Sequence, residues 1–366
     1  DAIPLGQSVT VQFDTADIAG QAIAGTDYTA IANQTVTFTS TDALTKTVSV
    51  TIANDLVDEP NETFQVNLSN ASGAILTQAS AIGTITDDDA PPTLLINDVT
   101  VTEGNAGTAS AVFTVTLSAA SGQPVSVNFA TANGTAVQPA DYVANSGTLT
   151  FAPGETTKTI TVAVAGDLLD EASETFNVNL ATPVNSTIAD AEGVGTITDD
   201  DAPPTLSIND VTVAEGNAGT ASAVFAVTLS AASGQTVTVN FATANGTAVQ
   251  PADYATNSGT LTFAPGETTK TITVAVAGDL LDEAAETFNV NLATPVNATI
   301  SDGTGLGTIT DDDATPTLSI NDATVTEGNA TTESASFTVT LSAASGQTVS
   351  VNFLTANGTA VQPEDY

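Results

Sequence analysis

The chain repeats itself with a period of 112 residues, and this periodicity restricts its fold more than any other feature. The segment INDVTVTEGNAGTASAVFTVTLSAASGQ begins at Ile96, and near-copies begin at Ile208 and Ile320. The recurring motif TITDDDA has as its first aspartates Asp87, Asp199 and Asp311. A unit of this length can bury its own core, so each period is expected to be a domain and not a short solenoid turn.

We place the repeat boundaries at the end of each Asp-Asp-Asp run. The predicted repeats are 1–89, 90–201, 202–313 and 314–366. The first lacks the start of the pattern, and the fourth stops near its middle. Because the chain begins with Asp1 and not with Met, we expect it to be an excerpt of a longer array.

Within the third repeat, apolar and polar residues alternate with period two, which is typical of half-buried strands. Turn sequences such as NGT, PGE and SGQ separate the alternating segments, and no helical periodicity competes with them. The expected strands lie near 206–213, 224–229, 237–241, 261–263, 272–276, 288–292 and 306–309. Seven such strands predict an all-β chain of tandem immunoglobulin-like, seven-stranded antiparallel β-sandwiches in a linear array.

The charge balance is one-sided, with 42 acidic side chains against three lysines and a net charge of −39. Nucleic acids and anionic membrane surfaces are excluded as partners because they are polyanions themselves. Cations fit this charge. The apolar fraction of 41% is high enough for folding if the charge is offset.

The chain has no Cys, Met, Trp or His. Disulfides and thiolate or imidazole metal sites are therefore excluded. Because His, Cys and Arg are missing and the same acids recur in every repeat, we expect no enzyme, the weaker alternative being a carboxylate-pair hydrolase. No apolar run approaches the length of about 20 residues that a membrane-spanning helix needs, so direct membrane insertion is not expected.

The predicted strand order brings distant acids together. Consecutive strands of a sandwich run in opposite directions, so the loops after its first, third and fifth strands and the exit of its seventh lie at one pole. Nine of the twelve acids in residues 202–313 fall at that pole. Two like charges about 4–5 Å apart repel by about 3–4 kcal/mol at an effective dielectric near 20, so this pole needs counter-ions.

Calcium is the cation that suits such a pole best. It accepts six to eight oxygen ligands in flexible geometry, which loops rich in carboxylates can supply. Magnesium is disfavoured because it retains water and demands octahedral geometry, and zinc and copper because no His or Cys is present.

The sequence resembles the Calx-beta family, the calcium-binding modules of sodium–calcium exchangers that also occur in large bacterial surface proteins. The resemblance extends over the whole chain. The motifs that carry it are VTEG, FATANGTAVQPADY, GTLTFAPGETTKTITV, GDLLDEASETFNVNL and GTITDDD. In this family, calcium is held by the first-strand Glu, the Asp before Tyr, acids of the loop after the fifth strand, and the terminal Asp run.

The resemblance implies metal ligands at matching positions of each repeat. The first repeat offers Asp27, Asp55, Glu59, Glu62, Asp87, Asp88 and Asp89. The second offers Glu103, Asp141, Asp167, Glu171, Glu174, Asp199, Asp200 and Asp201. The third offers Glu215, Asp253, Asp279, Glu283, Glu286, Asp311, Asp312 and Asp313. The fourth offers Glu327 and Asp365.

One departure from the family concerns the residue before the Asp of the loop after the fifth strand. Exchanger members often carry another Asp there, where this chain has Asn54, Gly166 and Gly278. Asp170 and Asp282 are extra acids of the same loop, and whether they are ligands or ordinary surface residues stays open. Glu155 and Glu267 are interpreted as turn residues near Lys158 and Lys270.

These features favour a calcium-binding structural array that forms a stiff rod, stalk or fibre of a secreted or cell-surface protein. Calcium ions and the neighbouring repeats of the chain are the expected partners. The alternative is a self-associating or adhesive filament or sheath subunit that mediates cell-surface attachment, with other copies of the protein as partners through exposed strand edges.

Overall fold

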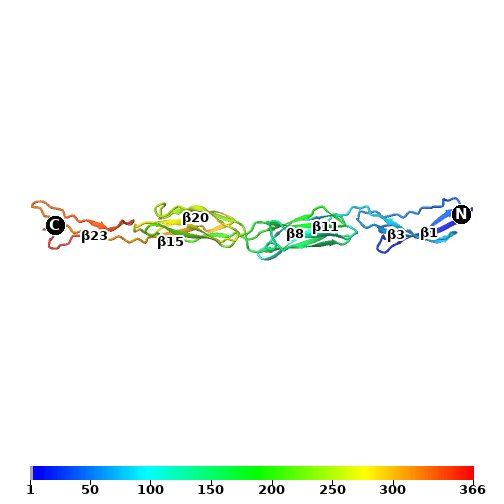
Figure 1. The fold of residues 1–366 in the computed structure, drawn as a ribbon, viewed down its shortest axis with the longest axis horizontal. Coiled ribbons are helices and arrows are strands. Elements are labelled where there is room, and N and C mark those ends of the chain that lie inside the picture. Colours follow the sequence, from blue (N-terminus) through cyan, green and yellow to red (C-terminus); the bar gives the residue numbers. More distant parts are fainter. Residues whose placement is uncertain (1–2) are drawn as a thin grey trace. The chain divides into compact units, whose positions relative to one another are not determined.

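The computed structural model describes residues 3–366, and this range contains strands and no helix. No segment of it therefore forms a helix long and apolar enough to cross a lipid bilayer. The chain divides into two compact units. The first comprises the residues up to Asp167 together with Ser173–Asp199, and the second comprises Leu168–Ala172 together with Asp200–Tyr366. Figure 1 labels strands of both units.

The third repeat is a sandwich of two sheets within the second unit. Its strands are β14 (Thr205–Ile208), β15 (Val211–Ala214), β16 (Gly219–Leu229), β17 (Val237–Asn245), β18 (Ser258–Phe263), β19 (Thr269–Gly278), β20 (Glu286–Val296), β21 (Thr299–Asp302) and β22 (Thr304–Thr310). One sheet has the order β19-β16-β14-β21, and the other has the order β15-β22-β20-β17-β18. The prediction of an all-β, immunoglobulin-like sandwich is confirmed.

The first predicted strand is split into two pieces that belong to different sheets. β14 pairs antiparallel with β16, whereas β15 pairs parallel with β22. The chain changes sheet at Asn209 and Asp210, whose side chains accept hydrogen bonds from the backbone N–H groups of Ala226 (2.5 Å) and Leu306 (2.8 Å). These short polar side chains take the place of ladder carbonyls at the crossing. The split of the first strand and the additional strand β21, which the sequence pattern did not predict, raise the number of strands from the expected seven to nine.

The core follows from the period-two pattern, since alternate side chains of each strand face the opposite sheet. In β16, Phe225 and Val227 are fully buried, and their strand neighbours face outward. The ring of Phe288 stacks on Tyr254 with centroids 4.6 Å apart and meets Phe225 edge-on at 5.9 Å. The sheets are thus joined by an aromatic cluster that also anchors Tyr254, in the loop between β17 and β18.

The second repeat has the same topology, and its strands lie in the first unit. Only Leu168–Ala172 and the residues from Asp200 onward belong to the second unit. Its strands are β5 (Thr93–Ile96), β6 (Val99–Thr102), β7 (Gly107–Leu117), β8 (Val125–Asn133), β9 (Ser146–Phe151), β10 (Thr157–Gly166), β11 (Glu174–Val184), β12 (Thr187–Ile188) and β13 (Glu192–Thr198). Their orders are β10-β7-β5-β12 and β6-β13-β11-β8-β9.

The first and fourth repeats form fewer strands. The first has one sheet of order β2-β1-β3-β4 and a small cluster of Ala22, Tyr28 and Phe64. Its strands are β1 (Ser8–Asp17), β2 (Gln34–Thr39), β3 (Glu62–Ser72) and β4 (Ser80–Ile85). The fourth has only the pair β23 (Leu318–Ile320) and β24 (Val339–Leu341), and without an opposing sheet its Phe353 is 90% exposed.

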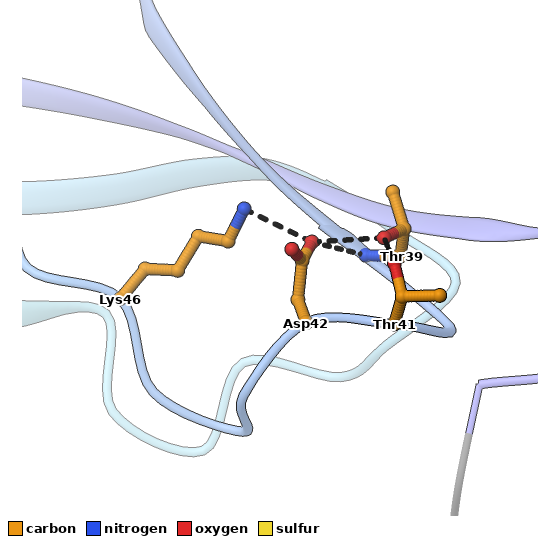
Figure 2. A network of polar contacts seen from close by, with 4 residues as sticks. All are labelled: Thr39, Thr41, Asp42 and Lys46. Atoms are coloured by element: carbon orange, nitrogen blue, oxygen red, sulfur yellow. Dashed lines mark hydrogen bonds and ion pairs between the residues drawn. The ribbon is translucent and has the colours of Figure 1, made fainter.

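Each of the three lysines is paired with an acid three or four residues before it. Lys46 Nζ lies 3.0 Å from Asp42 Oδ2, which also accepts hydrogen bonds from Thr39 (Figure 2). The interpretation of Glu155 and Glu267 is confirmed, because they lie 2.8 Å from Lys158 and Lys270. Lys270 and Gly278 are at opposite ends of β19, about 26 Å apart at about 3.3 Å per residue, so no lysine neutralises the acidic pole.

We expect Gly307→Ala to destabilise the third repeat by about 1–3 kcal/mol, because an added Cβ would lie 2.4 Å from Phe288 Cζ in the core. Amide hydrogen exchange of β20 and β22 in the full chain measures this loss. Thr271→Ala, an exposed change in β19, is the control and should stay within about 0.5 kcal/mol of wild type. Equal exchange rates in the Gly307→Ala and Thr271→Ala variants would show that the Phe288 ring does not occupy the space next to Gly307.

Candidate metal centre

The carboxylates of the third repeat stand at the ends of strands. Glu215 follows β15, Asp253 lies between β17 and β18, and Glu286 begins β20. The loop between β19 and β20 contributes Asp279 and Glu283, and the segment after β22 contributes Asp311, Asp312 and Asp313. β15 and β22 run parallel and therefore end at the same pole, and β20 begins at that pole because it pairs antiparallel with β22 and β17.

One group of three acids at this pole consists of Glu215, Asp311 and Asp313, with one carboxylate oxygen from each within 4.8 Å of the others. Glu215 is only 6% exposed. Asp313 Oδ1 accepts a hydrogen bond from the side-chain amide of Asn217, whereas Asp313 Oδ2 is buried without a hydrogen-bond partner. A buried carboxylate oxygen without a donor is costly, and a cation is the partner that this donor set fits.

Asp312 serves the same pole in a different way. Its Oδ1 accepts a hydrogen bond of 3.0 Å from the backbone N–H of Gly216, next to Glu215. This bond ties the segment after β22 to the loop after β15 and so helps to hold Glu215 beside Asp311 and Asp313.

A second group consists of Asp253, Glu283 and Glu286, again with one oxygen from each within 4.8 Å. Asp253 Oδ2 accepts a 2.6 Å hydrogen bond from the backbone N–H of Val249, which fixes the direction of its side chain. Three converging carboxylates with no basic residue form an all-oxygen donor set of the kind that hard divalent cations prefer.

Electrostatic effects show that the two groups are one network. Burial raises the pKa of Glu283, and the charges of Asp279, Asp253, Asp311 and Asp313 raise it further. Its neighbours therefore come from both groups. Glu283 therefore couples the two groups electrostatically.

Two glutamates at this pole have pKa values near neutrality. Burial, followed by the charges of Asp279, Glu283, Asp311 and Asp313, raises the pKa of Glu215 to about 7. Burial, followed by a hydrogen bond with Asp253 and the charge of Glu283, raises the pKa of Glu286 to about 7. Without a metal ion, protons thus relieve part of the repulsion.

The first repeat gathers its acids in the same way. Oxygens of Asp27, Glu59 and Glu62 lie within 4.8 Å of one another. Burial raises the pKa of Glu59, with further contributions from four aspartates, namely Asp55, Asp27, Asp87 and Asp89. All seven predicted ligands of this repeat, Asp88 among them, line one hollow.

The predicted ligands of the second repeat are divided between the two units. In the first unit, Glu103 follows β6 and is 6% exposed, and Asp141 lies between β8 and β9 with its Oδ2 accepting a 2.6 Å bond from Val137 N–H. Asp167 follows β10, Glu174 begins β11, and Asp199 follows β13. The remaining three, Glu171, Asp200 and Asp201, belong to the second unit.

The two candidates of the fourth repeat are not brought into a cluster. Glu327 and Asp365 are exposed, and within residues 3–366 neither takes part in a group of three acids. Asp365 Oδ2 accepts a 2.7 Å hydrogen bond from Val361 N–H, as Asp253 does from Val249 N–H in the third repeat.

Gly166 and Gly278 stand where exchanger members of the family often carry an additional Asp, and packing explains why glycine is needed there. A Cβ on Gly278 would lie 2.0 Å from the carbonyl oxygen of Gly216 and 2.6 Å from that of Glu215. Gly166 meets Gly104 in the same way. The loop after β15 therefore packs so closely on the end of β19 that no side chain fits there, and the sequence pattern could not reveal this contact.

The extra acids Asp170 and Asp282 are directed at other partners. Their Oδ2 atoms accept hydrogen bonds from Ser233 (2.9 Å) and Ser345 (3.0 Å). They are absent from the groups of three carboxylates found among residues 3–366. The sequence contained the signal for this contact, a serine 63 residues downstream of each such aspartate, but nothing in the pattern alone linked the two positions.

These features define a class of protein: tandem β-sandwiches whose one pole presents converging carboxylates and no basic group. The sequence profile of the Calx-beta domain matches residues 2–89, 87–201, 198–308 and 311–366. The chain belongs to the Calx-beta family and consists of tandem domains of that family.

Extracellular matrix protein 3 of Lytechinus variegatus is 32% identical to this chain over 279 residues. The match covers 68% of this chain and 8% of that protein's length. The chain thus spans a small part of this relative. The crystal structure of CBD12 from CALX1.2 is 20% identical with a TM-score of 0.30, covering 59% of this chain and 99% of its own. The calcium binding domain CBD12 of CALX1.1 is 24% identical to this chain with a TM-score of 0.29. The match covers 55% of this chain and 80% of that structure's chain.

We expect the calcium-depleted chain to be more stable near pH 5.5 than near pH 8. The folded pKa values of Glu215 and Glu286, about 7, exceed the unfolded value of about 4.3. The protonated carboxyls therefore stabilise the fold fully below the unfolded pKa, and this contribution is lost as the pH rises through about 7. Scanning calorimetry over this pH range measures the effect.

Glu215→Gln should weaken this pH dependence, because an amide does not titrate. Glu267→Gln is the matched control, since Lys270 lowers the pKa of Glu267 and places its titration below this pH range. A melting temperature that rises with pH in the calcium-depleted wild type would contradict the assignment.

Proposed function

We propose that the chain is a structural array of calcium-binding repeats, and that each complete repeat binds Ca²⁺ at its carboxylate pole. The observation that carries the proposal is the pair of groups Glu215–Asp311–Asp313 and Asp253–Glu283–Glu286, which includes the unpartnered buried oxygen of Asp313. We take the functional units to be the repeats 1–89, 90–201, 202–313 and 314–366.

Calcium is the ion favoured by the chemistry of the donors. Seven carboxylates of the third repeat interact with one another, and loops can adapt them to the six to eight oxygens that Ca²⁺ takes. We therefore propose the family's ligand positions, in every repeat, as the calcium ligands of this chain.

Calcium would act here by linkage. An ion that binds the folded pole and not the unfolded chain stabilises the fold by about 2.7 kcal/mol at a concentration 100 times its dissociation constant. Because Asp311, Asp312 and Asp313 lie on the segment that leads from β22 to the next repeat, a bound ion also restricts that segment. We propose that calcium stiffens the array in this way, as a stalk or fibre shaft requires.

An extracellular location fits this mechanism. Calcium outside cells is abundant enough to fill weak sites with dissociation constants of about 10⁻⁴–10⁻³ M. The similarity to Extracellular matrix protein 3 supports the same location. Because no His, Cys or Arg accompanies the acids, we propose a structural role and not a catalytic one.

Self-association is the second candidate function. β10 and β19 are edge strands of their sheets, and an edge strand can pair with another chain. Lys158 and Lys270 lie on these strands, and a lysine on an edge disfavours such pairing. Light scattering with and without calcium distinguishes a single chain from a filament.

We expect calorimetric titration of the full chain to show calcium uptake that depends on both groups of acids. The variants Asp311→Asn/Asp313→Asn and Asp253→Asn/Glu286→Gln should each lose at least one bound ion, because each removes two of three converging charges. Asp302→Asn, an exposed aspartate on β21, is the matched control and should bind as wild type does. Uptake that is unchanged in both double variants would overturn the proposal.

A further inference from the structure

One aspartate in each loop between the fifth and sixth strand passes is buried although the loop is otherwise acidic and open. Asp58, Asp170 and Asp282 are 8%, 6% and 7% exposed. Each is followed directly by a predicted metal ligand, namely Glu59, Glu171 or Glu283. A carboxylate is rarely buried unless it has a partner, so the contacts of these aspartates identify their role.

The partner is in every case a serine 63 residues further along the chain. Ser121, Ser233 and Ser345 donate to the aspartate Oδ2 at 2.9, 2.9 and 3.0 Å. The same hydroxyls lie 3.1, 3.1 and 3.3 Å from the aspartate carbonyl oxygens. Each serine Oγ also accepts from the backbone N–H two residues later, at 3.0–3.1 Å, so both functions of the hydroxyl are used.

The backbone completes the contact. The N–H groups of Gly122, Gly234 and Gly346 donate to the carbonyl oxygens of the three aspartates at 2.9, 3.0 and 3.0 Å, as short parallel bridges. A Cβ on Gly122 would lie 2.8 Å from Glu59 Cγ, and one on Gly346 would lie 2.8 Å from Glu283 Cγ. The glycine therefore lets the two segments approach this closely.

The contact joins segments of different predicted repeats. In the first unit, Asp58 belongs to repeat 1–89, whereas Ser121 lies between β7 and β8 of repeat 90–201. In the second unit, Asp282 belongs to repeat 202–313 and Ser345 to repeat 314–366. Asp170 lies in Leu168–Ala172, the part of repeat 90–201 that belongs with the second unit, as Ser233 does.

We propose that these aspartates are docking residues and not calcium ligands, and that each Asp and the Ser-Gly of the following repeat form a recognition contact between successive repeats that needs no metal. The partner of each acidic loop is thus a Calx-beta repeat with Ser-Gly between its second and third strand passes. The proposal does not rest on calcium binding, because the Oδ2 and carbonyl oxygens of the aspartates and the serine hydroxyls all have hydrogen-bond partners within the protein.

The test compares two triple variants of the full chain by amide hydrogen exchange after calcium depletion. Ser121→Ala, Ser233→Ala and Ser345→Ala together should speed exchange in 119–123, 231–235 and 343–347 by about tenfold or more, as the loss of a hydrogen bond to a charged group predicts. The control replaces Ser118, Ser230 and Ser342 by alanine. These hydroxyls accept from Thr93, Thr205 and Thr317 within their own repeats, so exchange at the docking segments should not change.

A third triple variant separates docking from metal binding. Asp58→Asn, Asp170→Asn and Asp282→Asn retain an oxygen that accepts from serine but lose the charge that a calcium ligand needs. We expect the number of calcium ions bound, measured by calorimetry, to stay as in wild type. Fewer bound ions in this variant, unchanged exchange in the first serine variant, or protection in wild type only with calcium would each overturn the proposal.

The outcome is independent of the proposed function. If the chain binds no calcium at all, the exchange experiment still tests the docking contact. If calcium binds but the serine variant exchanges as wild type does, only the docking proposal fails.

Discussion

Repulsion among carboxylates at one pole of each sandwich is the constraint on which the rest of the structure depends. Oxygens of three acids come within 4.8 Å of one another twice in the third repeat. At that separation two full charges repel by about 3 kcal/mol at an effective dielectric near 20. The positive side chains are at the far ends of the strands, paired with other acids. Protons on groups such as Glu215, or cations from solution, must therefore balance the pole.

The sandwich core makes this arrangement possible. The aromatic cluster around Phe288 and the close approach of Gly278 to the loop after β15 hold the ends of β15, β19 and β22 together. The acids cannot simply move apart, because they stand on strands whose positions the core determines. The same rigidity would favour the ion binding proposed above, since a pole that is already ordered loses little further order on binding.

Neighbouring acids of one loop face different partners. Glu283 contributes to a group of three carboxylates, whereas Asp282, the residue before it, accepts a hydrogen bond from Ser345. In extended chain, successive side chains point in opposite directions, so one short segment can serve a metal site on one side and the next repeat on the other. Gly346 packs against Glu283 itself, so the proposed docking contact and the proposed metal site lie next to each other.

The sequence by itself determined the repeat, the all-β sandwich and the pole at which the acids gather, because period-two alternation and alternating strand direction are local properties of the chain. It could not show that the first strand changes sheet at Asn209 and Asp210, since side chains there replace ladder bonds. Only the tertiary structure decided which acids meet each other and which, like Asp282, turn to a serine. That choice depends on atoms 63 residues away, which are brought near only when two repeats fold and pack.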